Sequence, residues 1–183
     1  MEYYLDIKIL PDPEFQATVL MNALYSKFHK TLCERHSKNI GISFPSYQVT
    51  LGNVLRLHGS SIELDKLQLG EWLGGTKGYC HISKAKPVPE NCQYRIVSRK
   101  QTTMSNSKLE RLIKRGSITP EEAKQYKAKM FTKGLDNPYV ELTSGSNGQR
   151  HRRYIQFGEL LDHPIEGEFD QFGLSKTATI PWF

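Results

Sequence analysis

The histidine of the segment LYSKFHKTL (residues 24–32) is a candidate for proton-transfer chemistry. Neutral imidazole accepts a proton near pH 7, and the two neighbouring lysines disfavour its charged form. On a helical period, His29 shares a stripe with Asn22, Tyr25 and Cys33, beside the apolar face of the helix rather than within it. A boundary histidine without a chemical role has the same spacing and is the commoner case. The segment alone therefore leaves both interpretations open.

A second candidate is the segment TSGSNGQRHRR (residues 143–153), in which Asn-Gly indicates a β-hairpin. The hydroxyls of Ser144 and Ser146 at the hairpin tip could position a ribose, and the basic or imidazole side chains that follow could grip phosphates. The alternative is a polar turn with a basic edge strand, where charge discourages pairing between sheets. The density of these side chains favours a nucleic-acid contact. The candidate RNA-binding residues here are Gln149, His151 and Arg152.

Two further groups of basic and amide side chains could contact nucleic acid. Arg99 and Gln101 alternate on one side of a predicted strand, and these residue types bind guanine and adenine in a bidentate way. A predicted helix carries Arg111 and Arg115 at i, i+4 spacing, which places both on one face within reach of successive phosphates. Lys108 and Lys114 flank this pair. Solvated surface is the alternative for both groups.

Basic residues are concentrated in the second part of the chain. Residues 1–75 hold 7 Lys/Arg and 8 Asp/Glu, whereas residues 76–183 hold 18 and 11. Residues 95–115 alone carry seven basic residues and one acidic residue. Such clustering suits a polyanion, and nucleic acid is the usual one.

Signatures of several other classes are missing from the sequence. There is no Walker loop, GxGxxG, HExxH or GxSxG motif and no acidic cluster typical of a magnesium site, so we expect neither a metal nor a cofactor. Three cysteines without CxxC spacing indicate reduced thiols in a cytoplasmic protein. No apolar run approaches the roughly 20 residues of a membrane span, and the N-terminus lacks the pattern of a signal peptide.

The first 86 residues follow the order β-α-β-β-α-β. Alternating or short apolar runs predict strands at 4–10, 40–45, 53–59 and 78–86, and helical spacing predicts helices at 14–36 and 60–75. This order is that of the ferredoxin-like (RRM-like) α+β fold, an antiparallel sheet with helices on one face.

The remainder of the chain has a different pattern. We expect an extended strand at 94–101, a basic helix at 105–115, a second helix at 118–130, and hairpin strands at 138–144 and 149–157. The tail is short-stranded and ends in Pro-Trp-Phe.

Several of these segments, taken in order, resemble the CRISPR repeat-processing endoribonuclease of the type I-F system. The resemblance is carried by YLDIKILPDPEF, VLMNAL, KFHK, IGISFP, YRIVSRKQ, SNGQ and the ending GLSK…PWF. It implies a ferredoxin-like domain at 1–92 and a smaller, divergent α+β RNA-binding domain at 93–183 with an arginine-rich helix. It also implies metal-independent cleavage at the 3′ base of a repeat stem-loop, through attack by the upstream 2′-hydroxyl. The enzyme would then keep the hairpin in a surveillance complex with other subunits.

The resemblance also assigns roles to particular residues. His29 matches the catalytic histidine, and Ser144 matches the serine that holds the attacking ribose, with Ser146 in support. Arg99 and Gln101 match the pair that reads the purines at the base of the stem. Arg111 and Arg115 match the helix inserted into the major groove of the hairpin.

Two positions depart from the family pattern. A tyrosine that orients the histidine is replaced by Phe172, which has no hydroxyl, so His29 must be oriented by something else. An aromatic residue that stacks on the terminal base is replaced by His151, a smaller platform. A catalytically weak subunit that only caps the hairpin is therefore an alternative, and a basic module without RNA specificity is another.

Overall fold

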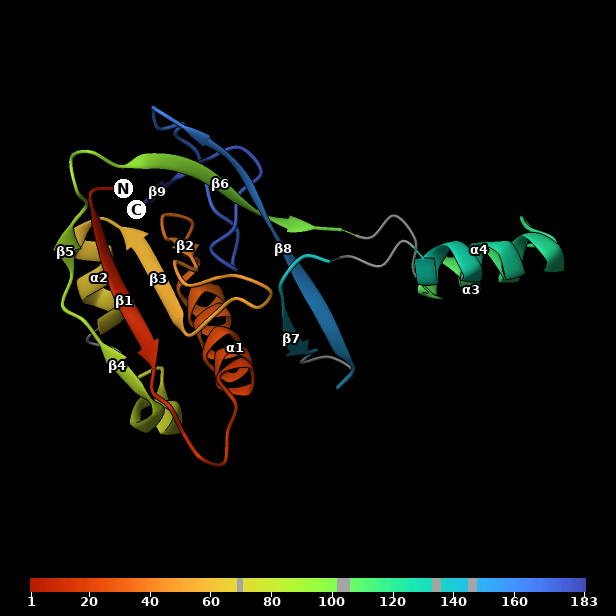
Figure 1. The fold of residues 1–183 in the computed structure, drawn as a ribbon, viewed down its shortest axis with the longest axis horizontal. Helices are drawn as coiled ribbons and strands as arrows, with labels where there is room; N and C mark the ends of the chain where they lie inside the picture. Colours follow the sequence, from red (N-terminus) through yellow and green to blue (C-terminus); the bar gives the residue numbers. More distant parts are fainter. Residues whose placement is uncertain (69–70, 102–105, 133–135, 145–147) are drawn as a thin grey trace.

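The computed structural model describes residues 1–68, 71–101, 106–132, 136–144 and 148–183. Its strands form two antiparallel sheets, and the chain passes from the first sheet to the second between residues 87 and 93 (Figure 1).

The first sheet has the strand order β2-β3-β1-β4, and β5 pairs with the start of β1. The strands are β1 (Tyr3–Ile9), β2 (Gly41–Ser43), β3 (Val54–Gly59), β4 (Cys80–Ile82) and β5 (Lys86–Pro87). Helix α1 (Ala17–Arg35) joins β1 to β2, and α2 (Ser61–Gln68) lies between β3 and β4. All strand pairs are antiparallel. This arrangement is the split βαβ unit of the ferredoxin-like fold, so the predicted α+β class is confirmed.

Helix α1 forms because one apolar stripe runs along it. Leu20, Leu24, Phe28 and Leu32 recur four residues apart, and all are buried. The helix ends at His36, whose φ of 49° is left-handed and whose N–H donates to the Cys33 carbonyl.

The region after β3 differs from the prediction. The helix expected at 60–75 ends at Gln68, residues 69–70 lie outside the described residues, and a 3₁₀ helix, η1 (Gly74–Tyr79), follows. Gly74 has a φ of 48°, a left-handed conformation that does not continue an α-helix. The single strand expected at 78–86 is two short strands, β4 and β5, and the one expected at 40–45 covers only Gly41–Ser43.

The second sheet has the order β7-β8-β6-β9. Its strands are β6 (Gln93–Lys100), β7 (Tyr139–Thr143), β8 (Arg150–Leu161) and β9 (Ile180–Trp182). The predicted hairpin is β7 and β8, although β8 extends four residues beyond the expected end.

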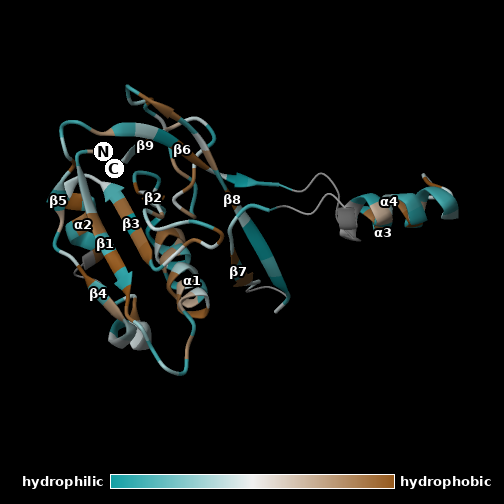
Figure 2. Ribbon diagram, viewed as in Figure 1, coloured by the Kyte–Doolittle hydropathy of each residue, from teal (hydrophilic) through white to brown (hydrophobic). Residues whose placement is uncertain are grey.

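Two helices, α3 (Asn106–Lys114) and α4 (Pro120–Thr132), come between β6 and β7 and project away from both sheets (Figure 1). The start of α4 is a capping box: Thr119 Oγ1 accepts from the Glu122 N–H, and Glu122 Oε2 accepts from the Thr119 N–H. Figure 2 shows that this pair is largely hydrophilic, whereas β1 and β3 carry hydrophobic residues. Leu109 is the buried apolar side chain of α3.

One hydrophobic cluster joins the two sheets. It includes Leu5 and Leu57 of the first sheet, Phe28 of α1, and Val97 and Ile155 of the second sheet. The division of the chain into two domains near residue 92 stays a prediction.

Candidate active site

The imidazole of His29 is held in one tautomer by the backbone. The carbonyl oxygen of Gln171 lies 2.8 Å from His29 Nδ1. A carbonyl oxygen can only accept a hydrogen bond, so in the neutral ring Nδ1 carries the proton and donates it. Nε2 consequently keeps its lone pair, and because the side chain is only half-buried, this nitrogen can accept a proton from a ligand.

The plane of the same ring is set by Phe172. The two rings are stacked with centroids 3.5 Å apart and planes 12° from parallel. This contact fixes the plane of the imidazole, because the ring cannot turn about its bond to the side chain without overlapping the phenyl ring. A hydroxyl is therefore not required to orient His29: the phenyl face and the Gln171 carbonyl together constrain the ring.

The loop that carries Gln171 and Phe172 is itself tightly held. Asp170 Oδ1 accepts from the N–H groups of Phe172 (2.8 Å) and Leu174 (3.0 Å). The Tyr25 hydroxyl donates to the Phe172 carbonyl at 2.9 Å. Gly173 has a φ of 69°, and a Cβ there would lie 2.8 Å from a side-chain carbon of Ile42. The loop of residues 170–176, called the GLSK loop below, thus forms a rigid support beside α1.

Cys33 and the Gln171 side chain complete the surroundings of the imidazole. Cys33 Sγ lies 3.5 Å from His29 Nδ1 and donates to Gln171 Oε1 at 3.2 Å. Burial and the nearby Glu34 raise the pKa of the Cys33 thiol, which keeps it protonated. Sequence reasoning placed Cys33 on the stripe of His29 but gave it no role, and it did not identify Gln171 at all. The spacing of four residues was the available signal for Cys33.

Ser144 follows the last residue of β7, the strand that packs against α1. Asn22 Oδ1 on α1 accepts from the Glu141 N–H at 2.9 Å, which fixes the helix to this strand. The Ser144 N–H donates to the Gln149 carbonyl, and the Gly148 N–H donates to the Ser144 carbonyl, so the two strand ends are hydrogen-bonded to each other. Ser146 lies outside the described residues. The roles of Ser144 and Ser146 stay predictions.

Arg99 and Gln101 border a cavity of about 470 Å³ close to the GLSK loop. Both side chains are exposed, and Arg99 pairs in register with Ile155 of β8. Three further cationic residues line this cavity, Lys38, Arg153 and Lys176, beside the two acidic residues Glu168 and Asp170, so cationic groups outnumber carboxylates here. A surface of this composition suits an anionic ligand.

The remaining candidate RNA-binding residues are exposed. On the hairpin, Arg152 lies 3.7 Å from Glu141 and stacks over Tyr139, and Gln149 and His151 are solvent-facing. The basic residues of the arginine-rich helix, with Arg115 just after its end, are exposed as well: Lys108, Arg111, Lys114 and Arg115. Figure 1 places α3 apart from α1, so one ligand contacting both must span the gap between them.

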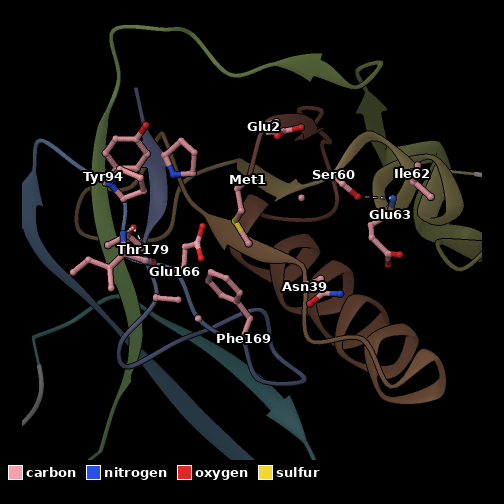
Figure 3. A pocket seen from close by; sticks show the side chains of 16 residues that line it. Met1, Glu2, Asn39, Ser60, Ile62, Glu63, Tyr94, Glu166, Phe169 and Thr179 are labelled. Carbon is pink, nitrogen blue, oxygen red and sulfur yellow. Dashed lines mark hydrogen bonds between the residues drawn. The ribbon is translucent and has the colours of Figure 1, made fainter.

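Other parts of the described surface suit nucleic acid less well. A cavity of about 740 Å³ has Glu2, Glu63 and Glu166 on its wall and no lysine or arginine (Figure 3). Among the described residues, no group of three or more histidine, cysteine or acidic side chains is placed to hold a metal ion. None of the described helices is long and apolar enough to cross a membrane.

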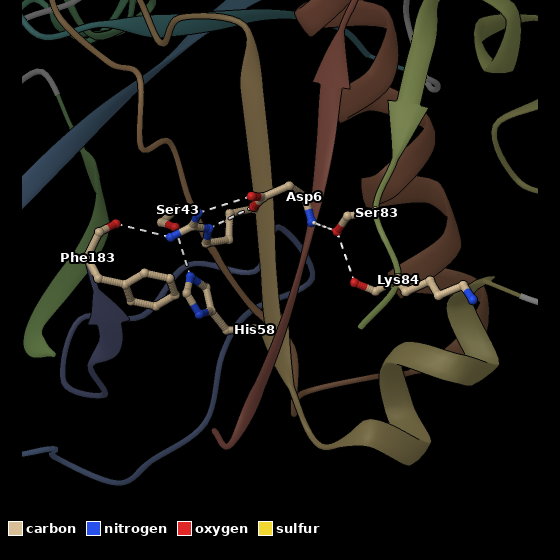
Figure 4. Close-up of polar contacts among 7 residues, drawn as sticks. Asp6, Ser43, His58, Ser83, Lys84 and Phe183 are labelled. Atoms are coloured by element: carbon tan, nitrogen blue, oxygen red, sulfur yellow. Dashed lines mark hydrogen bonds and ion pairs between the residues drawn. The ribbon is translucent and has the colours of Figure 1, made fainter. Parts of the chain in front are cut away.

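A second histidine, His58 on β3, has a different environment that sequence reasoning did not anticipate. Its side chain is fully buried, and its Nε2 lies 2.8 Å from the Ser43 hydroxyl (Figure 4). Burial, reinforced by the charge of Arg56, lowers the pKa of His58 to about 3. Arg56 donates to Asp6 and to the carbonyl of Phe183, so this polar group anchors the C-terminus.

Comparisons with known proteins identify a matching family and similar chains. Residues 4–183 match the family described as CRISPR-associated protein (Cas_Csy4). A protein of Escherichia coli (strain UTI89 / UPEC) named CRISPR-associated endonuclease Cas6/Csy4 is 42% identical over 184 residues, which is 100% of both chains. The protein of that name from Pseudomonas aeruginosa (strain UCBPP-PA14) is 37% identical over 187 residues, again 100% of both. A solved structure titled "Structure A of CRISPR endoribonuclease Cse3 bound to 19 nt RNA" has a TM-score of 0.38 and 14% identity, covering 99% of this chain and 100% of that one.

The match to the family model and to both relatives shows that the chain belongs to the Cas_Csy4 family of CRISPR-associated proteins. The resemblance to the type I-F endoribonucleases is thereby confirmed.

Proposed function

We propose that this chain is an endoribonuclease that cleaves CRISPR repeat RNA at the 3′ base of a stem-loop and releases mature crRNA. Membership of a family whose named relatives are CRISPR-associated endonucleases supports the class. The single observation that carries the chemistry is His29, whose Nδ1 is committed to the Gln171 carbonyl and whose Nε2 is left with a lone pair.

In the proposed reaction His29 is the general base. Nε2 takes the proton of the 2′-hydroxyl upstream of the cut, and the 2′-oxygen forms a bond to the adjacent phosphorus. The bond from phosphorus to the 5′-oxygen breaks, and that oxygen takes a proton from water, while His29 releases the proton that it accepted to solvent. The products are a 2′,3′-cyclic phosphate and a 5′-hydroxyl, and no step requires a metal ion. Ser144, with Ser146 in support, would hold the attacking ribose.

Recognition of the RNA rests on the basic surface. Arg99 and Gln101 are exposed and line the same cavity as the GLSK loop, where they could read the purines at the base of the stem. The basic residues of α3 would track the hairpin farther from the cut, and Gln149, His151 and Arg152 would contact it at the β7-β8 tip. We propose that the product hairpin stays bound and that the chain remains, in the cytoplasm, with other subunits of a crRNA-guided complex.

The alternative is a subunit that caps the hairpin with little or no cleavage. It was suggested by Phe172, which lacks the family's hydroxyl. The stacked and hydrogen-bonded imidazole of His29 disfavours this alternative. A protein that only binds RNA does not need a histidine that is held in one tautomer beside its RNA-binding surface.

Incubation with the cognate repeat hairpin in EDTA tests the proposal. We expect cleavage at one site, with a cyclic phosphate on the upstream fragment. Tight binding without cleavage would instead establish the capping subunit, and binding without preference for the hairpin would establish a basic module.

A further inference from the structure

The face of Phe172 opposite His29 is occupied by an arginine. Arg153 Cζ lies 3.3 Å from the centroid of the Phe172 ring, and the His29 centroid lies 3.5 Å from the same point. Two groups this close to one centroid cannot share a face, because their atoms would overlap. Imidazole, phenyl ring and guanidinium therefore form a three-layer stack in the order His29, Phe172, Arg153.

Arg153 is unusually enclosed for its residue type. Its exposed fraction is 7%, and its Nε has no hydrogen-bond partner among the described residues. Burial lowers the pKa of this guanidinium and the charge of Arg99 adds to that effect, while the neighbouring Tyr25 and Asp170 act in the opposite direction. The attraction between a cation and an aromatic face strengthens when the cation is desolvated, which offsets part of the cost of enclosing it.

The neighbouring arginine of β8 shows that this orientation is specific. Successive side chains of a strand point to opposite faces. Arg152 points outward, over Tyr139 and toward Glu141, whereas Arg153 points inward against Phe172. The basic run of the hairpin thus contains one arginine whose guanidinium packs against Phe172, although the residue also borders the cavity beside Arg99 and Gln101.

We propose that Arg153 is a positioning residue for cleavage, which holds the phenyl ring of Phe172 from behind and so keeps the imidazole of His29 in its plane with Nδ1 on the Gln171 carbonyl. The effect on cleavage rests on the function proposed above, but the effect on the ring does not. In this chain a cation behind the phenyl ring would replace the orienting hydroxyl that Phe172 lacks.

The experiment uses the full chain with labelled histidines and compares Arg153→Met and Arg153→Lys with the wild type. Stacking on Phe172 shifts the His29 ring proton resonances upfield, and His29→Ala assigns them. We expect Arg153→Met to move these resonances toward unstacked values and to slow single-turnover cleavage about 10-fold, less than the ~10²–10⁴-fold expected for loss of the base. RNA affinity should be unchanged, and Arg153→Lys should recover part of both effects.

Two further variants separate positioning from general destabilisation. Arg95→Met removes another guanidinium that lies over aromatic rings of the second sheet, with its Cζ 4.8 Å from the centroid of the Trp182 ring. This variant should leave the His29 resonances and the cleavage rate per folded molecule unchanged. If Arg153 acts through Phe172, Arg153→Met should add nothing in a Phe172→Leu background.

Additive effects in that double variant, or unmoved His29 resonances in folded Arg153→Met, would overturn the proposal. A weaker salt dependence of RNA binding in Arg153→Met, with the resonances in place, would overturn it in favour of a phosphate contact. Moved resonances in a protein that cleaves no RNA would support the positioning and overturn only the proposed function.

Discussion

The regions around His29 and His58 show how one residue type serves two purposes in the same chain. His58 is fully buried with its Nε2 beside the Ser43 hydroxyl, and its lowered pKa keeps it neutral within the first sheet. His29 lies at the junction of α1 and the GLSK loop, half-exposed, with one nitrogen satisfied by the Gln171 carbonyl.

The difference lies in access as well as in hydrogen bonding. Both rings have one nitrogen engaged by a neighbouring oxygen. The other nitrogen of His58 is enclosed without a partner among the described residues, so no substrate reaches it. Nε2 of His29 belongs to a half-exposed side chain beside a basic surface. A histidine can transfer protons to a ligand only in the second situation.

Of the changes that test this comparison, replacement of His29 is expected to have the largest effect. Replacement by alanine removes the proposed base and should lower the single-turnover cleavage rate by about 10²–10⁴-fold while leaving RNA affinity nearly intact. Cleavage assays and binding isotherms measure the two quantities separately. His81→Ala, at an exposed position of β4, is the matched control and should cleave normally. Wild-type cleavage by His29→Ala would remove the catalytic assignment.

The corresponding change at His58 should act on stability instead. His58→Ala leaves a cavity in the core and an unpaired Ser43 hydroxyl, so we expect the free energy of unfolding to fall by about 2–4 kcal/mol. Urea denaturation measures this loss. The folded fraction should still cleave at the normal rate, and a specific loss of rate would show that the two histidines are not functionally separate.

The pH dependence of stability sharpens the contrast. The pKa of His58 is about 3 in the folded protein, and about 6.5 is usual for an unfolded chain. The unfolded state therefore binds the extra proton first as the pH falls. Stability from this group is complete above pH 6.5 and should decline by about 2 kcal/mol by pH 5. The free energy of unfolding, measured by urea denaturation at several pH values, should fall more steeply toward pH 5 in the wild type than in His58→Gln. Equal dependence on pH in the two proteins would contradict the buried neutral ring.

The smallest effect is expected on the arginine-rich helix, which is remote from both histidines. Arg115→Met should reduce RNA affinity and lower the slope of log affinity against log salt by about 0.9, one phosphate contact. Single-turnover cleavage at saturating protein should be unchanged. An unaltered salt slope would place Arg115 off the RNA.

The order of elements was predictable from the sequence because alternation and helical spacing are local properties. The β-α-β-β-α-β order of the first part of the chain, the hairpin and the helix pair α3–α4 follow from such patterns. The end of α2 could not be predicted in this way, because apolar residues continue beyond the point where the chain turns toward the left-handed Gly74. Alternation also does not show that β4 and β5 are separate strands, since their pairing with β1 is set by tertiary packing.

The site was predictable only where a residue acts by its own chemistry. The prediction that His29 is catalytic came from its type, its place on the helix and the family resemblance, and it stays a prediction. The contacts that orient it come from residues more than 120 positions away, Gln171, Phe172 and Arg153, and no spacing rule connects them with α1. The inward direction of the Arg153 side chain depends on strand register. A run of adjacent basic residues in the sequence does not show which of them points inward.

A repeat hairpin with a 2′-deoxynucleotide at the attacking position tests the central claim most directly. If Nε2 of His29 removes the 2′-hydroxyl proton, this RNA should bind as tightly as the unmodified hairpin and remain uncut in a single-turnover assay. Cutting of the deoxy substrate at the same site would contradict the account, because the cleavage would then not depend on the hydroxyl that His29 is proposed to activate.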